Sequence, residues 1–218
     1  EQLEIAHRLA PGDLGLLADV ATLAARTGQL ERARALVAES VPRLETLEAA
    51  LAAGRFAASL GFSAECEQAA ERALEFEPGC AEAALLLAHA YASTGRIADA
   101  ERRLSALSSS SDSEPLHLEL ARLRRLLSDA DGAQAALQTW LARSPGSSAA
   151  RVMLAEEAAR RGEHEHARQL AEQAVVLAPD DPTALSTLAV FELRRRRDDL
   201  GLGALRRAMA LAPRRVAV

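Results

Sequence analysis

The spacing of the prolines is the feature of this sequence that most constrains its fold. Pro145, Pro179 and Pro213 are each 34 residues apart, and Pro78 lies 67 residues, nearly two such intervals, before Pro145. A period of about 20–50 residues indicates an array of similar units that bury their apolar faces against one another. Alignment on the prolines predicts six repeats, over residues 14–46, 47–80, 81–113, 114–147, 148–181 and 182–215.

Small residues recur at fixed positions of these repeats, where position 1 is the first residue of each repeat. Position 8 holds Ala21, Gly54, Ala88, Ala121, Ala155 and Ala189. Position 20 holds Ala33, Cys66, Ala100, Ala133, Ala167 and Gly201. Position 15 is glycine in four repeats, at Gly28, Gly61, Gly95 and Gly162. Apolar residues lie three and four residues apart on either side of position 15, so each repeat is predicted to form two amphipathic helices. The glycine ends the first helix, and the small residues let the two helices approach closely.

The composition agrees with an all-helical chain. Of the 218 residues, 50 are alanine, 36 are leucine and only six are aromatic. Ala and Leu favour helices, whereas strands are rich in β-branched and aromatic residues, so an all-β or doubly wound α/β fold is disfavoured. All 26 basic residues are arginine, which indicates a GC-rich and therefore bacterial genome. No apolar run is long enough to span a membrane.

These columns of small residues resemble the tetratricopeptide repeat (TPR), a helical hairpin of this length. The resemblance implies a right-handed, all-α solenoid of stacked antiparallel hairpins, continuous over residues 14–218. Residues 1–13 are then expected to be the second helix of a truncated preceding repeat. Among the departures from the family, position 4 never holds Phe, Tyr or Trp, and Trp140 occupies position 27, where a small residue is expected. The fourth repeat is therefore expected to pack differently.

In this family the side chains of the binding groove come chiefly from positions 2, 5, 9, 12 and 13 of the first helix. Carried over to this sequence, those positions give an apolar floor of Leu51, Leu85, Leu118 and Val152. They also give the flanking side chains Arg26, Arg55, His89, Arg122, Arg125, Arg160 and Arg194. Glu48, Glu82 and Glu156 partly neutralise these arginines. The resemblance thus implies a groove for a peptide or helix, while ion pairing of the arginines with glutamates of adjacent repeats is the alternative interpretation.

No motif predicts catalysis, a metal site or a cofactor. The run Glu163–His166 is the one metal-like cluster, but histidines two residues apart point to different faces of a helix. Cys66 lies in the packed column at position 20 and is expected to be a small buried apolar residue. We therefore expect a protein that is not an enzyme.

Three functional classes remain open. The first is a protein-interaction scaffold in a larger bacterial assembly, such as secretion or exopolysaccharide export, with a protein or peptide partner for which an acidic sequence is one candidate. Such a segment would be periplasmic or cytoplasmic. The second is an array fused to an enzyme, such as a glycosyltransferase or protease. The third is nucleic-acid binding through residues 182–218, which hold eight arginines and three acidic residues. The third is disfavoured because no aromatic residues are interleaved for base stacking.

Overall fold

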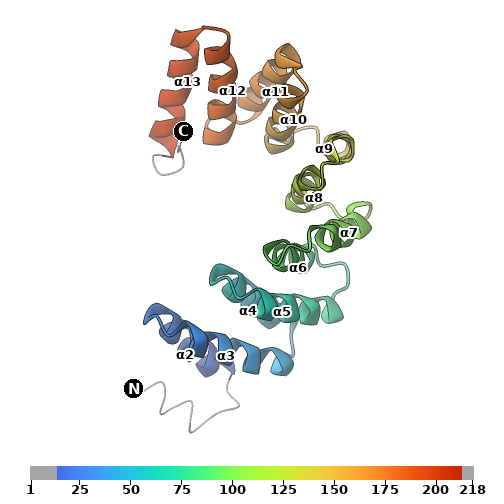
Figure 1. Cartoon of the computed structure of the whole chain (residues 1–218), viewed down its shortest axis with the longest axis vertical. Helices are drawn as coiled ribbons and strands as arrows, with labels where there is room; N and C mark the ends of the chain where they lie inside the picture. The colour runs from blue at the N-terminus through green and yellow to red at the C-terminus, as the bar shows by residue number, and fades with distance from the viewer. Residues whose placement is uncertain (1–13, 213–218) are drawn as a thin grey trace. The chain divides into compact units, whose positions relative to one another are not determined.

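The computed structural model describes residues 14–212, and every regular element within them is a helix (Figure 1). The helices follow one another in pairs joined by short turns. The first helices of the pairs are α2 (Leu14–Arg26), α4 (Leu47–Ser59), α6 (Ala81–Ser93), α8 (Glu114–Leu126), α10 (Ser148–Arg160) and α12 (Pro182–Arg194). The second helices are α3 (Leu30–Ser40), α5 (Ser63–Phe76), α7 (Ile97–Ser108), α9 (Ala130–Arg143), α11 (His164–Leu177) and α13 (Asp198–Leu211). A short 3-10 helix, η1 (Val41–Arg43), follows α3. The helix predicted over residues 1–13 lies outside the described residues.

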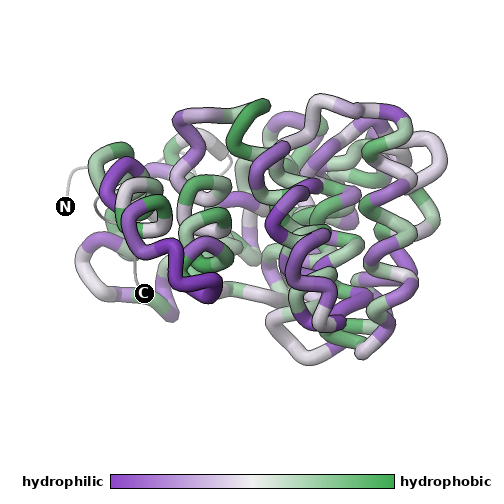
Figure 2. Tube along the Cα trace, turned by 90° about the horizontal axis from the view of Figure 1, so that it is seen from above, coloured by the Kyte–Doolittle hydropathy of each residue, from purple (hydrophilic) through white to green (hydrophobic). Residues whose placement is uncertain are grey.

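The chain divides into two compact units, Glu1–Leu116 and His117–Val218, which we call the N-terminal and C-terminal units. In the N-terminal unit α4 packs on α5, and α5 packs on α6 of the next pair. In the C-terminal unit α10, α11, α12 and α13 follow the same order of packing. Hydrophobic and hydrophilic residues alternate along the helices, as this packing requires (Figure 2). The predicted all-α stack of helical hairpins is therefore confirmed within each unit.

The small residues at position 20 lie where two helices of a pair approach most closely. Ala33, Cys66, Ala100, Ala133 and Ala167 are at most 1% exposed. At Gly201, in α13, an added Cβ would lie 2.6 Å from Leu193 Cγ of α12. Real Cβ atoms do not come that close to another carbon, so the helices could keep this separation only with glycine at position 201.

The turn between the two helices has the same geometry in all six pairs. In each, the residue at position 16 donates a backbone hydrogen bond to the carbonyl five residues earlier, as in Gln29 to Ala24 at 2.8 Å and Arg197 to Glu192 at 3.0 Å. This is the Schellman motif, in which position 15 adopts a left-handed conformation. Glycine meets that need in four pairs, but Ser128 has φ 63° and Arg196 has φ 57°. Each of these two residues costs about 1–2 kcal/mol of conformational strain.

The fourth hairpin accommodates Trp140 by a stacking contact. Trp140 is 6% exposed, and its ring lies 4.7 Å, centroid to centroid, from the ring of His117 at an interplanar angle of 20°. His117 is 1% exposed and occupies position 4 of its repeat. The large side chain at position 27 is therefore buried against an aromatic ring contributed by the first helix of the same pair.

Candidate interaction grooves between the first helices

A pocket of about 400 Å³ separates the first helices α10 and α12 of the C-terminal unit. We call it the C-terminal pocket, and its lining residues are Glu156, Ala159, Arg160, Thr187, Val190, Phe191 and Arg194. A second pocket of about 350 Å³, the edge pocket, is lined by His164, Glu165, Phe191, Arg194 and Arg195. Phe191 and Arg194 line both pockets, so the two pockets share this wall. We call the two pockets together the C-terminal groove.

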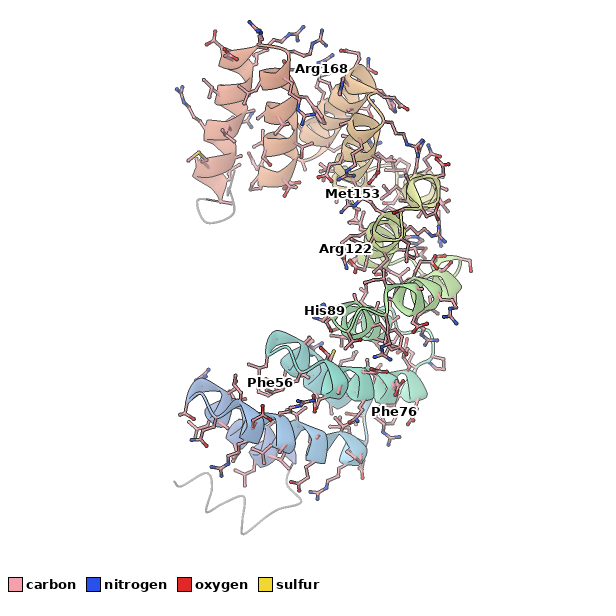
Figure 3. The ribbon with its side chains drawn as sticks, in the orientation of Figure 1. Phe56, Phe76, His89, Arg122, Met153 and Arg168 are labelled. Carbon is pink, nitrogen blue, oxygen red and sulfur yellow. The ribbon has the colours of Figure 1, made fainter. Side chains whose placement is uncertain are left out.

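A pocket of about 330 Å³ lies among α2, α3 and α4 in the N-terminal unit, and it shares with the C-terminal pocket position 9 of the earlier first helix and positions 6 and 10 of the later one. Its lining contains no charged side chain and consists of Gly15, Leu17, Ala18, Ala21, Thr22, Val37, Ser40, Leu44, Ala49, Ala52, Ala53 and Phe56. We call it the N-terminal pocket. In the N-terminal unit Phe56 and His89 lie on the side formed by the first helices, whereas Phe76, on a second helix, lies away from that side (Figure 3).

The sequence analysis did not single out Phe56, which is half-buried, or Phe191, which is 6% exposed and packs in the core while its edge lines a pocket. Both occupy position 10 of their repeats, and both line a pocket between successive first helices. Two of the four phenylalanines of the chain share this one position, which was the signal available in the sequence. It was missed because the comparison of columns concentrated on small residues.

The predicted apolar floor is only partly accessible. Leu51 is 9% exposed and belongs to the core of the N-terminal unit. Val152 is 4% exposed and packs with Ala174 and Ala184. Leu85 and Leu118 are half-buried. Leu51 and Val152 therefore belong to the helix-packing core, and a ligand would not meet them as a floor.

Four of the six predicted groove arginines form ion pairs with glutamates. Arg55 pairs with Glu82 of the next hairpin. Arg122 pairs with Glu119 of its own helix at 2.5 Å, and this hydrogen bond raises the pKa of Arg122. Arg55 thus pairs with a glutamate of the adjacent repeat, as the alternative interpretation expects, whereas Arg122 pairs within its own helix.

Arg125 and Arg160 share two glutamates of α10. Arg125 lies 3.5 Å from Glu156 and 3.6 Å from Glu157, and Arg160 lies 2.6 Å from Glu157. The Glu157 side chain is only 6% exposed, so these contacts supply the charge that a buried carboxylate needs. Arg160 reaches the C-terminal pocket, but its guanidinium is held by this pair.

The remaining predicted residues, Arg26, His89 and Arg194, are exposed. Neither Arg26 nor Arg194 has an ion-pair partner among residues 14–212. Arg194 lines both pockets of the C-terminal groove, whereas Arg26 is not among the residues that line the N-terminal pocket. Arg194 is thus the one predicted arginine that is both unpaired within the described residues and placed at a pocket.

A cluster of ion pairs fixes the helices behind the edge pocket. Arg168 of α11 donates a hydrogen bond of 2.8 Å to Glu165 and lies 3.6 Å from Glu192 of α12. The hydrogen bond from Arg168 lowers the pKa of Glu165. Glu192 is 5% exposed and also pairs with Arg197 at 3.6 Å. These contacts join α11 to α12 and so hold the walls of the groove.

Two ion pairs between hairpins occupy equivalent positions one repeat apart. Arg161 pairs with Asp131 at 2.7 Å, and Arg195 pairs with Glu165. In both cases the arginine is at position 14 and the acid is at position 18 of the preceding repeat. Within the arginine run 194–197, the charges of Arg195 and Arg197 are therefore matched by carboxylates.

The candidate metal and cysteine residues lie apart from these grooves or on their rim. Between residues 14 and 212 no three His, Cys, Asp or Glu side chains are grouped so that they could hold a metal ion. Cys66 is fully buried, donates a hydrogen bond of 3.5 Å to the carbonyl of Leu86, and has its pKa raised to about 11 by burial. His164 and His166 are exposed. None of the helices described is both long and apolar enough to cross a membrane.

Comparison with known proteins finds similar structures but no matching sequence family. No family model matches the chain, and no curated protein is similar to it. Its structure, however, resembles that of a tetratricopeptide repeat protein from Parabacteroides merdae, with a TM-score of 0.66 and 15% identity over 98% of this chain and 85% of that one. The chain has the tetratricopeptide repeat fold.

Two structures of MamA are also similar. One has a TM-score of 0.57 and 19% identity over 73% of this chain and 94% of that one. The other, from Desulfovibrio magneticus, has a TM-score of 0.58 and 13% identity over 80% of this chain and 99% of that one.

Proposed function

We propose that the chain is a non-catalytic protein-interaction scaffold that binds an extended peptide or a helix of a partner protein between its first helices. The observation that carries the proposal is the recurrence of a pocket bordered by two successive first helices in both units, each lined by the phenylalanine at position 10. Solenoid proteins use the continuous surface of their repeats for such binding.

The physical character of the pockets supports this function. Their volumes of about 330 and 400 Å³ fall within the range of ligand pockets, and their walls are helices already packed in pairs. A pre-formed pocket binds without ordering its own backbone, which reduces the entropic cost of association. An apolar side chain of a partner segment is the group that each pocket accepts.

We place the scaffold in a larger bacterial protein or assembly, with secretion or exopolysaccharide export as the setting. An array fused to an enzyme is the second candidate. The domains that flank this segment in the full-length gene distinguish them, since a catalytic domain would favour fusion. Nucleic-acid binding is less well supported, because Arg195 and Arg197 are already paired with carboxylates.

Selection of a phage-displayed library of random dodecapeptides on the immobilised chain tests the proposal, with two valine variants as a matched pair. Val190 of the C-terminal pocket is 46% exposed, and Val176, on the second helix α11, is 80% exposed. We expect Val190→Asp to weaken the selected peptides about tenfold or more by fluorescence anisotropy, and Val176→Asp to leave them unchanged. The opposite result would place binding on the second helices, and a library with no enriched peptide would remove the proposal.

A further inference from the structure

We propose that Arg194 binds the carboxylate of an aspartate or glutamate in the partner segment, next to an apolar residue that occupies the C-terminal pocket. This inference rests on the proposed function, because it assigns the chemistry of the segment that the groove accepts. The partner is thus a peptide in which an acidic residue neighbours a large apolar one.

The first step is the distribution of charge in the C-terminal unit. Residues 117–218 contain 16 arginines and 13 acidic residues, whereas residues 1–116 contain 10 arginines and 18 acidic residues. An acidic ligand is therefore attracted to the C-terminal unit and repelled by the N-terminal one. Within the groove, Arg160 is held by Glu157 at 2.6 Å, so its fork is already occupied. Arg194 is left as the cation with capacity to bind a new carboxylate.

The second step is the surroundings of Arg194. Its side chain lines both the C-terminal pocket and the edge pocket, and the two pockets share Phe191 beside it. Val190 adds an apolar surface that is 46% exposed. An arginine stem can lie along such a surface while its planar guanidinium binds a carboxylate through two parallel hydrogen bonds. An apolar side chain seated over Val190 would shield these hydrogen bonds from water and strengthen them.

The third step is the choice of a carboxylate over a phosphate-bearing ligand. Glu156 lines the C-terminal pocket and Glu165 lines the edge pocket, so two carboxylates flank Arg194. Both are paired with arginines, Glu156 with Arg125 and Glu165 with Arg195, and the repulsion that remains is larger for a phosphate dianion than for a singly charged carboxylate. Phe191 is 6% exposed and offers no ring face on which a base could stack. A single carboxylate matches the single available fork.

The experiment uses the peptides selected on the full chain from the dodecapeptide library and compares two charge reversals in the same repeat. Arg194→Glu removes the proposed partner of the carboxylate. Arg206→Glu, at an exposed residue of α13, makes the same change in net charge away from the groove. We expect the selected peptides to be enriched in an acidic residue beside Leu, Ile, Phe or Met. Their affinity should fall about tenfold or more in Arg194→Glu and less than about twofold in Arg206→Glu.

A third variant, Glu156→Gln, should tighten the same peptides severalfold, because it removes a carboxylate that lines the pocket. Circular dichroism melts of all three variants establish that the fold is retained. If peptides are selected without acidic residues, or if Arg194→Glu binds them as well as the wild type does, the inference is wrong while the scaffold function stands. If no peptide is selected, both fail. Tighter binding of a mixed single-stranded oligonucleotide than of any peptide, lost in Arg194→Glu, would overturn the inference in favour of nucleic acid.

Discussion

The N-terminal and C-terminal pockets have the same origin in the repeat but opposite chemistry. Each lies between two successive first helices, and each is lined by phenylalanine at position 10, Phe56 in one and Phe191 in the other. The N-terminal pocket contains no charged side chain, whereas three of the seven residues of the C-terminal pocket are charged. The two pockets therefore share a phenylalanine at position 10 while the rest of their lining differs.

The two linings differ in their first helices and also in α3, which contributes Val37 and Ser40 to the N-terminal pocket alone. Position 9 supplies Thr22 to the N-terminal pocket and Glu156 to the C-terminal one. Position 13 of the following helix is Arg194 in α12, which lines the C-terminal pocket, and Ser59 in α4, which is not among the residues that line the N-terminal pocket. Under the proposed function, a partner segment would therefore meet different chemistry at the two pockets.

The largest expected effect comes from Ala167→Leu, which tests whether the C-terminal pocket depends on the packing behind it. Ala167 is fully buried in a cluster with Ala171 and Phe191. Adding atoms to a packed core costs about 1–3 kcal/mol of the free energy of unfolding. Thermal denaturation should show this loss, and binding of acidic peptides should be reduced.

The matched control is Gln169→Leu, which adds leucine to an exposed position of the same helix and should change the free energy of unfolding little. If Ala167→Leu and the wild type had the same melting temperature, α11 would not pack closely against the floor of the C-terminal pocket.

An exchange of the residues at position 13 sharpens the comparison directly. Arg194→Ser should weaken acidic peptides at the C-terminal pocket by about 1.4 kcal/mol, a tenfold change. Ser59→Arg should give the N-terminal unit a severalfold gain for the same peptides, since an exposed ion pair contributes up to about 1 kcal/mol. Isothermal titration calorimetry measures both variants. If Arg194→Ser loses affinity for acidic peptides but Ser59→Arg gains none, the apolar N-terminal pocket does not bind these peptides even when position 13 supplies an arginine.

The turns allow a smaller test that concerns stability alone. Ser128→Gly and Arg196→Gly should each raise the free energy of unfolding by about 0.5–1 kcal/mol, because glycine adopts a positive φ without strain. Gly162→Ala, which places a Cβ at φ 81°, should lower it by a similar amount. Chemical denaturation measures these changes. No stabilisation in Arg196→Gly would show that the arginine side chain compensates for the strain.

The smallest expected effect is the response to salt. Raising the ionic strength screens exposed charges, so acidic peptides should bind the C-terminal pocket about threefold more weakly. Apolar peptides at the N-terminal pocket should be insensitive to the same change, because burial of apolar surface is not screened. Fluorescence anisotropy at two salt concentrations measures both. An equal response of the two pockets would remove the distinction between them.

The sequence predicted the fold well because the period of the prolines and the small residues at positions 8 and 20 follow directly from how the helices pack.

The sequence predicted the candidate site less well. Positions 5 and 9 were carried over from the family, yet Val152 is covered by Ala174 and Ala184 of neighbouring helices, which a single helix pattern does not reveal. The partners of the arginines depend on where glutamates of other helices come to lie, as Glu157 does for Arg125. Ser128 and Arg196 could not be recognised as left-handed residues, because neither is glycine.

The two equivalent ion pairs between hairpins have a consequence for how arrays of this kind change length. Asp131 and Glu165 occupy the same position in adjacent repeats, as do their partners Arg161 and Arg195. Removal of residues 148–181 would therefore bring Arg195 opposite Asp131, with an acid and an arginine again in register. Loss or duplication of one 34-residue segment in the gene would therefore keep an arginine opposite an acidic residue at this contact between hairpins.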